Sequence, residues 1–128
     1  MRALNPASAP PPFARYSHGI EVPAGARLVF CSGQLGIGAD GVVPEGVEDQ
    51  ARLCFRAIGA ILAEAGMGFA DVVRFNAFVT SAQYLGGYMK ARDEFAGSPP
   101  PASTLMVVRG FARPEFKVEV EAVAARAP

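Results

Sequence analysis

Apolar residues recur at helical spacing in the middle of the chain. The positions that share one face between residues 47 and 65 are Val47, Ala51, Cys54, Ile58, Ile61, Leu62 and Ala65. Charged residues such as Glu48, Arg52 and Arg56 fall on the opposite face, as expected of a helix that packs one side against a core. Gly66 follows the last apolar position, where glycine commonly ends a helix. The pattern predicts a helix from Val47 to Ala65.

A second helical stripe lies between residues 82 and 95. Its members are Tyr84, Tyr88, Ala91 and Phe95. Ser81 can cap the first turn, whereas Gly86 and Gly87 each cost about 1 kcal/mol relative to alanine inside a helix. Three consecutive prolines at positions 99–101 cannot continue a helix. We therefore expect a helix from Ala82 to Phe95.

Five other segments are rich in β-branched and aromatic residues and are predicted as strands. They are Tyr16–Val22, Arg27–Ser32, Asp71–Thr80, Thr104–Gly110 and Lys117–Ala125. The turn residues Pro23 to Gly25 favour a hairpin between the first two. The glycine-rich residues 33–46 are predicted as a loop, and the proline-rich residues 1–12 as an extended segment.

These elements predict one α+β domain over residues 1–128, in the order β-β-α-β-α-β-β. A chain of this length supports one core and leaves little room for a second. Two helices cover only one face of a mixed β-sheet. The other face must be buried elsewhere, and self-association is the simplest way to bury it.

Charge and hydropathy exclude two classes of partner. Twelve basic residues balance twelve acidic ones, and no basic run offers a footprint for nucleic acid. No stretch approaches the roughly 20 apolar residues that span a bilayer, and the first residues turn polar before a signal-peptide core could form. We expect a cytoplasmic protein that binds neither nucleic acid nor membrane.

Metal, thiol and phosphate chemistry find little support in the sequence. Cys31 and Cys54 lie at apolar positions and are expected to be buried and reduced. One histidine, His18, and two separated cysteines do not make a metal-ligand set, and His18 is expected at the surface. The glycines from Gly33 to Gly41 lack the lysine-serine pair and the helix that a phosphate loop requires.

Short motifs along most of the chain resemble those of the RidA/YjgF family, also called endoribonuclease L-PSP-like. They are Tyr16-Ser17-His18, Cys31-Ser32-Gly33-Gln34, Glu48-Asp49-Gln50, Ala63-Glu64-Ala65-Gly66, Asp71-Val72-Val73, Pro101-Ala102, Arg113-Pro114-Glu115-Phe116 and Val118-Glu119-Val120-Glu121-Ala122. The resemblance implies a chorismate-mutase-like fold, assembled as a homotrimer with a central β-barrel and helices outside. It also implies a small-molecule cleft between neighbouring subunits, where enzymes of the family hydrolyse enamines or imines without a cofactor.

The resemblance also implies roles for particular residues. Glu119 would orient the attacking water and shuttle a proton, Tyr16 would line the cleft wall, and the small Ser32-Gly33 backbone would let amides approach the ligand. For Glu121, on the same strand face, we favour a solvated or interface carboxylate.

The family's carboxylate-binding arginine has no counterpart in this sequence. It follows a Pro-Ala pair in the family, which places Ser103 at its position and is the assignment we favour. Counting back from Glu119 instead points to Thr104. Neither side chain can pair bidentately with a carboxylate. Arg109 lies roughly 16–20 Å along the strand, too far to replace it, and the sequence does not place Arg74 or Arg92 in the cleft.

Two hypotheses about function follow. The first is a hydrolase for an imine, an enamine or a related metabolite, because the water-orienting half of the site is present. The second is a non-catalytic trimer that holds a small ligand or a protein partner in the same clefts, because the arginine most tied to catalysis is absent.

Overall fold

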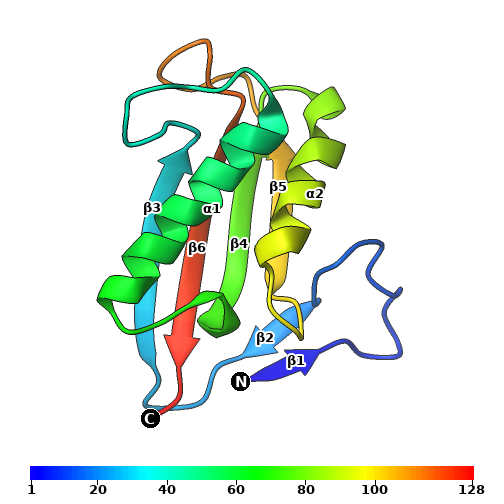
Figure 1. Ribbon diagram of the computed structural model, residues 1–128. Helices are drawn as coiled ribbons and strands as arrows, with labels where there is room; N and C mark the ends of the chain where they lie inside the picture. Colours follow the sequence, from blue (N-terminus) through cyan, green and yellow to red (C-terminus); the bar gives the residue numbers. More distant parts are fainter.

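The computed structural model describes residues 1–128 as a four-stranded sheet covered on one face by two helices (Figure 1). The strands of this sheet are β3 (Arg27–Leu35), β4 (Val72–Val79), β5 (Ala102–Val107) and β6 (Val118–Arg126), and the helices are α1 (Val47–Glu64) and α2 (Leu85–Phe95). Two short strands, β1 (Arg2–Leu4) and β2 (Gly19–Glu21), form a separate ribbon at one end. The expected α+β fold with both helices on one face of a mixed sheet is confirmed.

The strand order in the large sheet is β3-β6-β4-β5. β6 runs antiparallel to both of its neighbours, whereas β4 and β5 are parallel. Parallel neighbours need a long crossover connection, and here α2 provides it. The strand that comes last among these four along the chain therefore lies inside the sheet, between β3 and β4.

The hairpin expected from the first two predicted strands is wrong, because β2 pairs with β1 and not with β3. Arg2 lies opposite Glu21, and their side chains form an ion pair. The predicted order of elements thus gains one strand, β1, which lies within residues 1–12, the segment predicted to be extended. β3 also continues to Leu35 through residues expected in a loop, with a shift of register between Cys31 and Gln34.

The two helices form as predicted, with small differences at their starts and ends. Ser81 caps a single 3₁₀ turn, Ala82–Tyr84, that leads into α2. Gly87 lies where α2 touches α1, since a Cβ there would come within 2.7 Å of Val47 Cγ1. The helix-breaking glycine is therefore required by close helix packing. Neither helix has the length and apolar character needed to cross a membrane.

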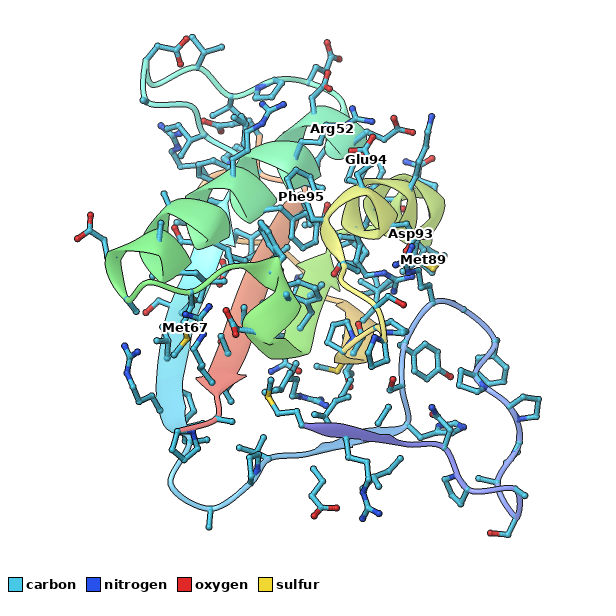
Figure 2. All side chains as sticks on the ribbon, turned by 60° about the horizontal axis from the view of Figure 1, so that its bottom comes forward. Arg52, Met67, Met89, Asp93, Glu94 and Phe95 are labelled. Carbon is cyan, nitrogen blue, oxygen red and sulfur yellow. The ribbon has the colours of Figure 1, made fainter.

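An aromatic cluster forms the core between the helices and the sheet. The ring of Phe55 lies 5.2 Å from that of Phe75 on β4 and 5.2 Å from that of Phe95 on α2, measured between centroids. Outside this cluster, the exposed Glu94 joins α2 to Arg52 of α1, and Figure 2 shows these two side chains beside each other. The covered face is thus apolar within and ion-paired at its rim.

Gln50 ties the first turn of α1 to the start of β6. Its buried side chain donates to the carbonyl oxygens of Pro44 and Glu115 and accepts a hydrogen bond from the Lys117 amide at 2.9 Å. A Cβ at Gly36 would lie 2.7 Å from Gln50 Cα, so the β3–α1 loop passes directly over this side chain. The clamp holds Lys117, which directly precedes β6 and lies two residues before Glu119.

Candidate functional site

The face of the sheet turned away from the helices is called the open face here. Alternate residues of β6 are buried against the helices, so Glu119, Glu121 and Val123 point the other way. The same alternation and the strand pairing add Leu28, Phe30 and Ser32 from β3, Arg74, Asn76 and Phe78 from β4, and Thr104 and Met106 from β5. Polar side chains from all four strands thus share this face with the exposed apolar residues Leu28, Phe30 and Met106.

Glu119 lies directly against Gly33. A Cβ at position 33 would lie 2.7 Å from Glu119 Cδ and would overlap one of its carboxylate oxygens, so a larger residue there would push this carboxylate out of its present place. The register shift in β3, after which Leu35 pairs with Glu119, brings the two residues together. The sequence assigned Gly33 to close approach by a ligand, and in the structure Glu119 itself fills that space.

The Glu119 carboxylate is half-buried and makes no ion pair. Burial raises the pKa of this carboxyl above its ordinary value, and the nearby charge of Glu121 raises it further. A raised pKa means that this carboxyl group keeps its proton to a higher pH than an exposed glutamate does, which helps a group that exchanges protons with a substrate. Glu119 therefore has the environment of a general acid-base group.

A shallow hollow of about 370 Å³ lies beside Glu121 on the open face. Its walls include Phe30, Ser32, Asn76 and Val123. The hollow combines an aromatic wall with hydroxyl, amide and carboxylate groups, which is the mixture that fixes small polar ligands. Ser32, predicted as a site residue, thus borders this hollow.

Ser103 and Thr104 lie on opposite faces of β5. Ser103 pairs with the buried Phe75 and shares its face with Leu105, which packs against the core. Thr104 pairs with Asn76, which in turn pairs with Glu121. Of the two positions considered for the missing arginine, only Thr104 therefore shares a face with Glu119.

Arg74 stands beside Thr104, although the sequence gave no means of placing it. Its Nη2 donates to Thr104 Oγ1 at 2.7 Å, and its Nε donates to Asn76 Oδ1 at 2.9 Å. The signal that could have found it is alternation along β4, where Arg74 and Asn76 alternate with the core positions Phe75 and Ala77.

Tyr16 lies at the opposite end of the sheet from Glu119. Its ring packs edge-on against His18, and the intervening Ser17 bridges to Ala102 at the start of β5. Ala102 pairs with Arg74, whereas Glu119 pairs with Phe78, and four residues of strand span about 13 Å. One chain therefore does not bring Tyr16 and Glu119 together.

The two cysteines were predicted to be buried core residues, and the structure confirms their burial. Both are free and buried, and burial raises the pKa of the Cys54 thiol to about 12. A thiol with so high a pKa is a poor nucleophile at neutral pH. His18 is exposed, also as predicted.

Comparison with known proteins gives a consistent family. The family described as Endoribonuclease L-PSP matches residues 6–126. The chain is 30% identical over 123 residues to the putative reactive intermediate deaminase TdcF of Escherichia coli K12, covering 92% of each protein. It is also 30% identical over 129 residues to the 2-iminobutanoate/2-iminopropanoate deaminase of Capra hircus, covering 99% of this chain and 91% of that protein.

Two solved structures share the whole fold. One is YyfB from Yersinia pestis, of the conserved Rid protein family and of unknown function, with a TM-score of 0.84, 29% identity and 98% of each chain covered. The other is E. coli TdcF with bound serine, with a TM-score of 0.72, 26% identity, and 99% of this chain and 100% of that chain covered.

Proposed function

The chain belongs to the Endoribonuclease L-PSP family, whose members here include reactive intermediate deaminases, and on that premise we propose that it hydrolyses a small imine or enamine. The observation that carries the proposal is the Glu119 carboxylate, which is half-buried, has a raised pKa and has no cation beside it. The names of its relatives TdcF and the Capra hircus deaminase support the same reaction class.

In the proposed reaction, Glu119 orients one water molecule toward the imine carbon. As the water oxygen bonds to that carbon, the carboxylate accepts a proton from the water and passes it to the nitrogen. The hydroxyl proton of the resulting carbinolamine then moves to the nitrogen as the C–N bond breaks, which releases ammonia and leaves a carbonyl product. An enamine follows the same route after a proton has converted it to the imine. Water is the only co-reactant that this route consumes.

The proposal places the reaction in clefts between copies of the chain. Phe30 is 73% exposed, Leu28 52% and Met106 50%, and apolar groups gathered on one face commonly mark an interface. Tyr16 and Glu119, both expected in the cleft, lie at opposite ends of one sheet, so a cleft that contains both needs two copies. Three copies are the number that the family resemblance implies. Light scattering at micromolar concentration tests this, and a stable monomer would contradict it.

Glu119→Gln tests the chemistry while it preserves size and hydrogen bonding. We expect ammonia release from freshly generated 2-aminoacrylate to fall about 100-fold or more, the usual contribution of a general acid-base group. Glu64→Gln, which makes the same change of charge at the exposed end of α1, is the matched control and should retain the wild-type rate.

Three outcomes of this assay have distinct meanings. Equal rates for wild type and Glu119→Gln would remove Glu119 from the mechanism. Hydrolysis by neither protein, combined with retained binding of small ligands, would replace the proposal with a non-catalytic binding assembly. A selective loss in Glu119→Gln alone supports it.

A further inference from the structure

Arg74 is a shielded cation whose hydrogen bonds reach no carboxylate, a trait it shares among the partly buried cations only with Lys117, which donates to the Glu45 carbonyl oxygen. It is half-buried, and both of its hydrogen-bond acceptors, Asn76 Oδ1 and Thr104 Oγ1, are neutral. Arg52 by comparison contacts Glu48, Asp49 and Glu94. No carboxylate lies within ion-pair distance of Arg74. A partly desolvated positive charge is thus held in place and left uncompensated.

The two hydrogen bonds also determine which edge of the guanidinium is free. Nε and Nη2 form one edge of the planar group, and Asn76 and Thr104 occupy it. The second N–H of Nη2 and the neighbouring N–H of Nη1 remain, and these two form the end-on fork that matches the two oxygens of a carboxylate. Asn76 and Thr104 therefore orient Arg74 without consuming its capacity for bidentate binding.

The space beside Arg74 suits a small anion. A hollow of about 320 Å³ is bordered by Arg74, His18, Ile20, Val73 and Ala102. Its other lining residues are Gly19 and Val123, so most of the wall is apolar or backbone. This size and lining fit a few-atom ligand with one charged end and a short apolar remainder.

We propose that Arg74 is the carboxylate-binding cation of this protein and that it takes small ligands with one carboxylate and a short apolar remainder. Arg74 reaches from β4 to the place beside Thr104, where the sequence itself provides no cation. The identity of the substrate class rests on the proposed hydrolysis, whereas carboxylate binding by Arg74 does not depend on any turnover.

Equilibrium binding tests this directly. The probe is 2-oxobutanoate, followed by ligand-observed NMR, with the neutral 2-oxobutanamide as its uncharged counterpart. Arg74→Gln should weaken binding of the acid about 10- to 100-fold, as expected for loss of a hydrogen-bonded charge, and should leave the weak binding of the amide unchanged. Arg109→Gln removes the same charge from an exposed position two residues after the end of β5. This control variant should bind the acid like wild type.

A second variant tests whether the lost binding can be restored. In Arg74→Gln/Thr104→Arg, the guanidinium returns to the same place from β5 instead of β4, and binding of the acid should recover to within about fivefold of wild type. This result requires a folded protein, so it separates loss of the cation from general damage to the sheet.

Several outcomes would overturn the proposal. One is acid binding by Arg74→Gln within twofold of wild type, and another is equal binding of acid and amide by the wild type. A third is dissociation of the assembly in Arg74→Gln, seen by light scattering, because Arg74 would then pair with a carboxylate of another copy. Hydrolysis that fails while acid binding still depends on Arg74 would refute the proposed reaction and leave this inference intact.

Discussion

The two faces of the sheet are built from alternate residues of the same strands, yet they meet opposite requirements. On the covered face, Phe55 packs against aromatic rings from β4 and α2, and nearly every group there has a partner within the chain. On the open face, Glu119 and Arg74 lack oppositely charged partners and Phe30 is largely exposed. The covered face therefore accounts for the stability of one chain, whereas the unpaired charges and the exposed ring of the open face fit the proposed ligand and the proposed contact with another copy.

The largest expected effect breaks the covered face. Phe55→Ala should lower the free energy of unfolding by about 3–5 kcal/mol, because a fully buried ring is removed from the centre of the aromatic cluster. Urea denaturation monitored by circular dichroism measures it. The loss should be the same at every protein concentration.

Phe30→Ala is the matched change on the open face. It should leave the folding of one chain nearly intact and weaken only the concentration-dependent part of the stability, the part that association supplies. If Phe30→Ala instead destabilised the chain at all dilutions, the two faces would not differ in the way described.

A substitution of intermediate effect tests the contact between Gly33 and Glu119. Gly33→Ala should cost about 1–3 kcal/mol, since the new methyl group overlaps the Glu119 carboxylate and forces it aside. It should also lower the rate of imine hydrolysis, because the displaced carboxylate no longer holds water in place. Gly110→Ala is the control, because nothing lies within 4 Å of a Cβ there. A stable and fully active Gly33→Ala protein would show that the close contact has no functional weight.

The smallest effect compares two carboxyl groups with opposite pKa shifts. Arg126 forms an ion pair with Asp71 and holds the pKa of that carboxyl below its usual value, so its stabilisation is present above the unfolded-state pKa and is lost as the pH falls through the folded-state value. For Glu119 the pKa is raised, so its favourable contribution exists below the unfolded-state pKa and is lost as the pH rises through the folded-state value.

Denaturation of two variants across the acid range measures these signs. Asp71→Asn should destabilise by about 1 kcal/mol near neutral pH, with the difference from wild type shrinking toward low pH. Glu119→Gln should be as stable as wild type or more so near neutral pH. The opposite trends would contradict the assignment of paired and unpaired carboxylates.

The periodic segments of the sequence predicted the helices and long strands well. The sequence did not predict contacts between segments that lie far apart along the chain. The helix predicted at residues 47–65 and the strand predicted at residues 71–80 differ from α1 and β4 by no more than one residue at either end. They are accurate because amphipathic repetition is a local signal. The strand at Arg2–Leu4 was missed because three residues hold too little alternation to register. Its pairing with β2 also joins segments that only the folded chain brings together.

The candidate site shows the same division. Glu119 and Gly33 could be proposed from the resemblance, but their contact depends on the register shift in β3, which no residue pattern announces. The choice between Ser103 and Thr104 depends on the residue at which β5 begins, and an error of one residue reverses the face. Arg74 was found only in the structure, because its hydrogen bond to Thr104 joins residues 30 positions apart in the chain.

The position of β6 within the sheet has a consequence for how the protein is made. β3 and β4 do not pair with each other, and each pairs with β6, which leaves the ribosome after every other strand. Until residues 118–126 emerge, the nascent chain has helices and strand segments whose apolar sides lack their central support. A growing chain of this kind must postpone the collapse of its apolar segments, with or without a chaperone, until the last strand is available. A chain whose early strands pair in order has less need of such a delay. The same nine residues that carry Glu119 thus complete the fold.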